Sequence, residues 1–256
     1  MLLAYIGASQ GGSGAGAEAE CQAATAVLES EGDLDGLAEG WLGTGRLRAW
    51  LGDVPAGQEA LERAVAYARQ SGNHRAQVQA SGALAATFLP LPIPVDAAIA
   101  RVEQLLYDVG GEPAAEAHVL GPLSELYAYA GRFADARAAM ARTRSLLTAS
   151  GARLNLARGT MVAGRIELAA GDPAAAERYW REGYEAFRAM GERGHCGTQA
   201  GMLAEALYRQ GRLDEAQLMT EEAQSIAVRD DPDAQARWRT VRAKLLARRG
   251  QFPAAR

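Results

Sequence analysis

The chain has 256 residues, 48% of them hydrophobic, and can therefore bury ample apolar surface. Its formal net charge of −4 gives no basic footprint for nucleic acid, and its two cysteines, Cys21 and Cys196, are too few for a disulfide framework. The apolar opening of residues 1–8 is far shorter than the roughly 20 residues of a membrane span and lacks the basic start of a signal peptide. We expect a cytoplasmic protein that contacts neither nucleic acid nor membrane.

A turn residue recurs every 39 or 40 residues along the whole chain. The series is Gly12, Gly52, Pro92, Gly131, Gly171, Gly211 and Gly250. A second series falls about twenty residues later, at Gly32, Gly72, Gly111, Gly151, Gly191 and Asp231. The sequence therefore consists of internal repeats, and each repeat unit divides into two halves.

The halves are predicted to be helices. Leu123, Leu126 and Tyr127 follow the i, i+3, i+4 spacing of a helical face, and Asp172 followed by Pro173 is typical of a helix start. No stretch alternates with a period of two, so strands are not expected. Each unit is predicted to be a helix A, a tight turn and an antiparallel helix B.

The first repeat begins inside a helix. Residues 1–10 correspond to the end of a helix A, and Cys21 is expected to be a packed thiol in the following helix B. The glycine-rich run of residues 11–16 lacks the Gly-Lys-Ser/Thr ending of a phosphate loop and is predicted to be an interhelix turn.

The third turn is a proline-rich segment, residues 88–95. Its prolines are expected to end helix A early and to replace the tight turn by an extended crossing. The crossing is either a bend in the superhelix or a docking ledge. In the next helix A, Gly121 and Pro122 are expected to loosen or kink the helix.

The later repeats contain the clearest core residues and no convincing catalytic or metal site. Trp180 and Tyr184 lie at i and i+4 on a helix B, which indicates core packing. His195 and Cys196 are adjacent and therefore point apart on a helix, which makes them a poor ligand pair. We expect no catalytic residues, no metal and no cofactor.

The last repeat stops early, because residues 252–256 begin a helix B that does not finish. Two interpretations remain open: the chain is a fragment of a longer protein, or its ends pack against something else.

Small residues recur at two positions of each unit. Seven residues before six of the seven turns stand Gly45, Ala85, Ser124, Gly164, Ala204 and Ala243, whereas the first turn has Tyr5 at this position. Five residues after each turn stand Ala17, Gly57, Ala97, Ala136, Ala176, Ala216 and Ala255. Small side chains at these positions let two helices approach closely.

These features resemble the tetratricopeptide repeat family in a longer variant of about 40 residues, against a consensus of about 34. Three phrases, at residues 94–101, 177–193 and 203–216, are similar to the repeat regions of bacterial cyclase- or ATPase-type and transcription-regulatory signalling proteins. The resemblance implies an all-α, right-handed superhelical solenoid of antiparallel helix pairs, with about six units. Residues 1–256 are expected to form a single array.

The resemblance also implies that A helices line an inner groove. Counting back from each turn gives the candidate groove residues, namely Arg46, Trp50, Glu125, Tyr129, Arg158, Met161, Arg165, Glu205, Tyr208, Arg209 and Lys244. Charges alternate along the column six residues before each turn, so Arg165 is expected to bridge Glu125 and Glu205. The column is either a partner-binding surface or a solvated, self-paired face.

We expect the chain to be a non-catalytic scaffold. It would bind a protein segment or another domain of a parent chain as part of a bacterial signalling or regulatory protein. The alternative is a small-ligand sensor or enzyme that encloses an anionic ligand within the superhelix, with Arg158, Arg165 and Arg209 around a closed pocket. The sequence does not indicate an oligomeric state.

Overall fold

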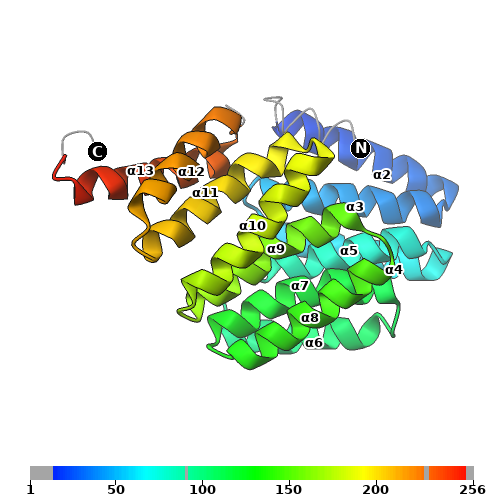
Figure 1. Cartoon of the computed structure of the whole chain (residues 1–256). Coiled ribbons are helices and arrows are strands. Elements are labelled where there is room, and N and C mark those ends of the chain that lie inside the picture. Colours follow the sequence, from blue (N-terminus) through cyan, green and yellow to red (C-terminus); the bar gives the residue numbers. More distant parts are fainter. Residues whose placement is uncertain (1–13, 90–91, 228–230, 252–256) are drawn as a thin grey trace. The chain divides into compact units, whose positions relative to one another are not determined.

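The computed structural model describes residues 14–89, 92–227 and 231–251, which form twelve helices and no strand (Figure 1). The helices are α2 (Gly14–Glu31), α3 (Leu34–Trp50), α4 (Val54–Ser71), α5 (His74–Thr87), α6 (Val95–Asp108), α7 (Pro113–Tyr129), α8 (Phe133–Ala149), α9 (Arg153–Ala169), α10 (Pro173–Met190), α11 (Arg193–Arg209), α12 (Leu213–Ile226) and α13 (Pro232–Arg248). The odd-numbered helices are the A helices of the repeat and the even-numbered ones are the B helices. The all-α fold predicted from the sequence is confirmed. Residues 1–13, and with them the first turn at Gly12, lie outside the described residues.

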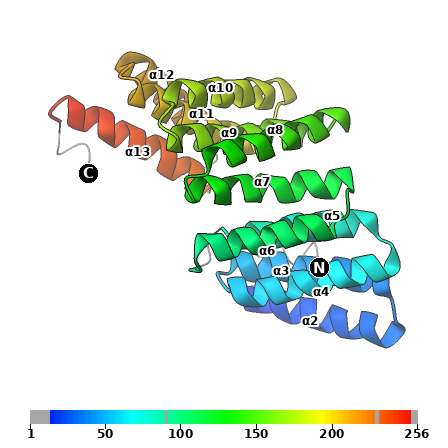
Figure 2. The ribbon, with the colours of Figure 1, turned by 90° about the horizontal axis from the view of Figure 1, so that it is seen from below.

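Two compact units, Met1–Leu126 and Tyr127–Arg256, divide the chain within α7. In unit 1, α3 packs against α2 and α4, and α4 packs against α5 (Figure 2). In unit 2, α10 packs against α9 and α11, and α11 also packs against α12 and α13. In each of these pairs within a unit, apart from α11 with α13, the two helices follow each other in sequence, as expected for a repeat.

A two-residue signal at the interhelix turns explains where many helices end and begin. A glycine with positive φ ends one helix, and an Asp or Asn directly after it caps the next; Gly171 with a φ of 84° and Asp172 are one example. The carboxylate of Asp172 accepts a hydrogen bond from the backbone N–H of Ala175 at 2.8 Å. Asp33, Asp53 and Asn73 cap α3, α4 and α5 in the same way. The left-handed conformation favours glycine, and the cap satisfies one of the free N–H groups of the helix start.

The small residues allow the close helix packing that the sequence predicts. A Cβ added to Gly45 would lie 2.6 Å from Leu61 Cγ and 2.9 Å from the carbonyl oxygen of Gly57, so α3 and α4 pack there without room for a side chain. A Cβ on Gly164 would overlap the indole ring of Trp180, which is 2% exposed. Ala204 and Ser124 are also fully buried. The apolar core therefore lies along the seams between successive helices.

The proline-rich crossing ends helix A early, as predicted, but it also shifts the repeat by one residue. α5 ends at Thr87, and α6 begins at Val95, three residues after Pro92. The helices α4, α8, α10 and α12 instead begin two residues after their turn glycine. The sequence prediction placed the small core residue of α6 at Ala97, and this was wrong: Ala97 is exposed, whereas Ala98 is 2% exposed. Pro90 and Leu91 lie outside the described residues.

α7 continues through Gly121 and Pro122 without a break in the helix. The hydroxyl of Ser124 donates a hydrogen bond to the carbonyl oxygen of Gly121 at 2.6 Å. Proline lacks the N–H that would bond the carbonyl of His118, so this turn is weaker than its neighbours. Within the described part of the chain, no helix combines the length and apolar character needed to cross a bilayer.

Candidate interaction site

A cavity of about 370 Å³ opens on the A helices of unit 2. We call it the α11–α13 cavity; α9 and Trp180 of α10 complete its walls. Of the candidate groove residues, Arg165, Glu205 and Lys244 line it, and these are the residues six positions before three successive turns. The repeat register thus places side chains from three different helices around one hollow.

Glu205 is the electrostatic centre of this site. Both of its carboxylate oxygens lie 2.8 Å from Nζ of Lys244, and Oε1 also accepts a hydrogen bond from Nε of Arg209 at 2.8 Å. The Glu205 side chain is only 16% exposed, whereas that of Arg209 is 57% exposed. One step of the alternating column is therefore an ion pair between α11 and α13. The ladder from Glu125 through Arg165 stays a prediction.

Tyr208 extends this cluster toward the end of α13. The ammonium of Lys244 lies 5.7 Å from the centre of the Tyr208 ring, and the guanidinium carbon of Arg248 lies 5.4 Å from it. Nε of Arg248 also donates a hydrogen bond to the Tyr208 hydroxyl at 3.3 Å. Cation–π contacts of this kind orient both basic side chains over one aromatic face. Four of the candidate groove residues, Glu205, Tyr208, Arg209 and Lys244, thus form one connected group.

The cavity combines an apolar floor with an excess of one positive charge. Leu168, Met202 and Val241 line it together with Trp180, and all four belong to or pack on the same core cluster. Its charged lining residues are Arg165, Arg237 and Lys244 on the basic side and Glu205 and Asp233 on the acidic side. Nε of Arg237 pairs with Asp233 at 2.9 Å. The repeat pattern identified Arg165, Glu205 and Lys244, but the contribution of Trp180 and Val241 follows only from how α10 and α13 pack.

The structure places the remaining candidate residues elsewhere. Met161 packs against two core clusters and its carbonyl oxygen accepts a hydrogen bond from Nε1 of Trp180 at 3.2 Å. Arg158 is exposed on α9, and Tyr129 is 64% exposed at the end of α7. Arg46 is half-buried on α3, and Glu125 is 9% exposed on α7. The side chain of Trp50, the last residue of α3, lies outside the described residues. In unit 2, Met161 therefore serves packing rather than the cavity.

A second carboxylate network joins α10 to the turn between α11 and α12. The positions counted back from the turns did not predict it. Glu177 accepts hydrogen bonds from Arg181 at 2.7 Å, from Gln210 at 2.8 Å and from Arg212 at 2.5 Å. Burial alone would raise the pKa of Glu177, but the hydrogen bonds from Arg181 and Gln210 and the charge of Arg212 hold that pKa below its ordinary value. Gln210 lies one residue before the turn at Gly211, and this position of the repeat is not among those that were identified as groove positions.

The residues with potential catalytic or metal chemistry are used for packing. Cys21 is 1% exposed and Cys196 is 7% exposed, and burial raises the pKa of both thiols. The ring of His195 stacks on Phe187 with centroids 5.3 Å apart. Trp180 and Tyr184 are buried, as predicted, and the Tyr184 hydroxyl donates a hydrogen bond to Glu222 at 2.8 Å. Among the residues that the structure describes, no group of three or more His, Cys, Asp or Glu side chains could hold a metal ion.

Comparison with solved structures finds similar helical-repeat chains. BtubC (BKLC) from P. vanneervenii is 19% identical, with a TM-score of 0.61 over 77% of this chain and 85% of that one. A tetratricopeptide repeat protein from Parabacteroides merdae is 13% identical, with a TM-score of 0.59 over 93% and 89% of the two chains. A Podosopora anserina protein described as a kinesin light chain with nearly identical TPR-like repeats is 18% identical, with a TM-score of 0.54 over 73% and 93%. No family model and no curated protein matches the sequence.

Proposed function

We propose that this chain, which has the tetratricopeptide-like fold of antiparallel helix pairs, is a non-catalytic scaffold that binds a segment of another protein on its A helices. Repeat proteins of this fold generally mediate protein–protein interaction, and they are typically not enzymes. The resemblance drawn from the turn residues and small residues is confirmed at the level of the fold. The observation that carries the proposal is the α11–α13 cavity, where three A helices converge on one apolar hollow with a charged rim.

The lining of the cavity indicates the chemistry of the segment. Trp180, Met202 and Val241 offer an apolar floor for one side chain of the partner. Arg237 and Lys244 stand at the rim, each already paired with one carboxylate, and the three basic lining residues outnumber the two acidic ones. A partner segment with one acidic and one apolar side chain complements this surface. Large apolar and basic groups are also the side chains that dominate binding energy at interfaces.

The wider context of the scaffold is part of the same proposal. The phrases at residues 94–101, 177–193 and 203–216 support a role in a bacterial signalling or regulatory protein. The buried free thiols of Cys21 and Cys196 support a reducing compartment, the cytoplasm. Because the turn series continues across the division within α7, we further propose that both units belong to a single repeat array.

Enclosure of a small anion within the groove of unit 2 is less well supported. That function would need Arg158, Arg165 and Arg209 around one pocket. Of these three residues, only Arg165 lines the α11–α13 cavity. The ion pair between Glu205 and Arg209 moreover already neutralises one of the required cations. The geometry therefore favours a polypeptide segment over a small anion at this site.

The proposal is tested by selecting peptides from a displayed random library on the immobilised full chain and measuring their affinities for variants. Lys244→Ala and Arg237→Ala are each expected to lower the affinity for the selected peptides about tenfold or more, because each removes a basic group at the rim. Arg178→Ala is the matched control, because Arg178 is exposed on the B helix α10 and is not among the lining residues. Circular dichroism melts show whether each variant keeps its fold.

Two results would count against this site. The first is a selection whose peptides bind the wild type and all three variants equally well. The second is a loss of binding with Arg178→Ala alone, which would move the interaction to the B helices.

A further inference from the structure

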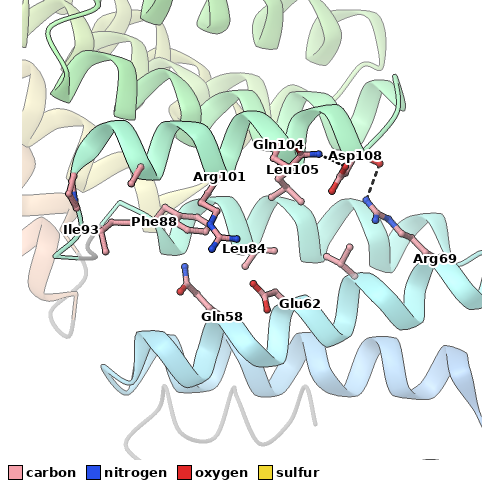
Figure 3. Close-up of a pocket in the computed structure, with 13 residues that line it drawn as sticks. Gln58, Glu62, Arg69, Leu84, Phe88, Ile93, Arg101, Gln104, Leu105 and Asp108 are labelled. Carbon is pink, nitrogen blue, oxygen red and sulfur yellow. Dashed lines mark hydrogen bonds between the residues drawn. The ribbon is translucent and has the colours of Figure 1, made fainter.

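Three cavities on the B helices occupy equivalent positions in the repeat. Each lies between two successive B helices above the intervening A helix: α2 and α4 above α3, α4 and α6 above α5, and α8 and α10 above α9. Their volumes are about 270, 580 and 240 Å³ respectively. The α4–α6 cavity in unit 1 is therefore about twice as large as its two counterparts (Figure 3).

Each smaller cavity has a lining residue that belongs to an ion pair between two helices. The ion pair joins the residue six positions after one turn to the residue four positions before the next. In the α2–α4 cavity, Nε of Arg48 lies 3.0 Å from Glu18. In the α8–α10 cavity, Arg137 donates three hydrogen bonds to Glu167, the shortest at 2.6 Å. The same two positions thus hold opposite charges, with the signs exchanged between the two cavities.

The α4–α6 cavity lacks this pair. Gln58 and Phe88 occupy the two equivalent positions, so no charge pair can form between them. The amide nitrogen of Gln58 is buried and has no hydrogen-bond partner in the described part of the chain. A buried N–H without an acceptor is unfavourable, and most such groups in proteins find one. Gln58 thus places a buried, unpartnered donor at the wall of this cavity, where the other two cavities have a charge pair beside them.

The cavity lies beside the late start of α6, where the repeat is shifted by one residue. α6 begins one residue late, and Ile93 from the crossing stands at one end of the cavity, as Figure 3 shows. Arg101 of α6 then extends from above toward Glu62 and Gln58 of α4. Leu84 and Phe88 of α5 supply the apolar back wall between them.

Two opposite charges face this cavity without being paired. Arg101 and Glu62 are exposed, and neither forms a hydrogen bond or an ion pair with another described residue. The other two charged residues at the cavity are engaged: Arg69 donates to the carbonyl oxygen of Asp108 at 2.9 Å, and the Asp108 carboxylate accepts from Gln104 at 2.8 Å. Neither of these two contacts is an ion pair, so the cavity carries the charges of two cations and two anions, and among these four residues only Arg101 and Glu62 form no hydrogen bond with another described residue.

We propose that the α4–α6 cavity binds a free α-amino acid with a large apolar side chain. The carboxylate of such a molecule accepts hydrogen bonds from the Arg101 guanidinium, and its ammonium pairs with Glu62. The side chain packs on Leu84, Phe88 and Ile93. A simple anion is repelled by Glu62 and a simple cation by Arg101, so a zwitterion matches the free charges best. This site lies in unit 1 on the B helices and does not depend on the proposed function.

The test is isothermal titration calorimetry of the full chain with L-leucine and L-phenylalanine. We expect binding, and about tenfold weaker binding for N-acetyl-L-leucine and for L-leucinamide, because each has lost one charge. Arg101→Gln and Glu62→Gln are each expected to weaken the binding of L-leucine about tenfold. The matched controls are Arg75→Gln on α5 and Glu59→Gln on α4, which are exposed and not among the lining residues, and these are expected to leave the affinity unchanged.

Three results would overturn the proposal. One is the absence of any heat with L-leucine and L-phenylalanine at millimolar concentration, with the melt of the wild type intact. Another is binding that survives both Arg101→Gln and Glu62→Gln. The third is a tripeptide ending in leucine that binds as tightly as the free amino acid, which would assign the cavity to the C-terminus of a polypeptide.

Discussion

Single small residues decide how closely the helices of this repeat pack. Gly164 on α9 faces the indole ring of Trp180, and Gly45 on α3 faces Leu61 and the backbone of Gly57. Glycine in a helix interior normally costs stability, so its presence at these positions has a packing reason. The expected close packing at the small residues seven positions before a turn is confirmed at Gly45 and Gly164, because the close approach of two helices there leaves no room for a Cβ.

Gly164→Ala tests this packing argument. The added methyl group would overlap Trp180, and we expect the free energy of unfolding to fall by about 1–3 kcal/mol. Gly159→Ala on the same helix is the matched control. A Cβ at Gly159 meets nothing within 4 Å, so this change is expected to be neutral or to stabilise by about 0.5–1 kcal/mol. Urea unfolding followed by circular dichroism measures both, and equal effects of the two changes would refute the argument.

Glu177 gives unit 2 a pH-dependent contribution to stability. Its pKa in the folded chain lies below the ordinary value of 4.5, so its contribution is fully present above pH 4.5 and is lost as the pH falls through the folded pKa. Glu177→Gln is expected to lower the free energy of unfolding at pH 7 by about 1–3 kcal/mol. The difference from the wild type should shrink at about pH 3. Glu185→Gln, an exposed change on the same helix, is the control, and a pH-independent loss with Glu177→Gln would contradict this assignment.

At the scale of elements, the turns were predictable and the exact packing was not. A glycine followed by Asp or Asn identifies a helix end and a helix start locally, as at Gly52 and Asp53, without knowledge of the rest of the fold. The one-residue shift of α6 was missed, because the extended path of a proline-rich segment depends on where the next helix packs. Three of the charges of the α11–α13 cavity followed from the register, but the burial of Met161 depends on the packing of α10.

Pro122 offers a test at the level of one helix. α7 continues through this proline, which lacks the N–H that would bond the carbonyl of His118. Pro122→Ala restores that donor, and we expect the free energy of unfolding to rise by about 1–3 kcal/mol. Pro113→Ala is the matched control, because Pro113 is the first residue of α7, where a proline loses no helical hydrogen bond. A lower urea midpoint for Pro122→Ala would show that the proline is required by its surroundings.

At the scale of the whole molecule, the chain combines two surfaces with different chemistry. The A helices of unit 2 carry a charged rim around an apolar floor, while the B helices of unit 1 carry a wide cavity with unpaired groups. In a repeat protein each surface depends mainly on its neighbouring helices, so the two sites are expected to respond independently to substitution. Arg101→Gln should therefore leave peptide binding unchanged, and Lys244→Ala should leave leucine binding unchanged, when both ligands are titrated against each variant.

Site-specific photo-crosslinking of a selected peptide shows which helices of unit 2 bind the partner segment. The photoreactive residue p-benzoylphenylalanine replaces Thr240, which is exposed and lines the α11–α13 cavity, or Arg178, which is exposed on α10 outside it. If the A helices of unit 2 bind the partner segment, position 240 crosslinks the peptide and position 178 does not. Crosslinking from position 178 with none from position 240 would contradict binding of the partner segment at the α11–α13 cavity.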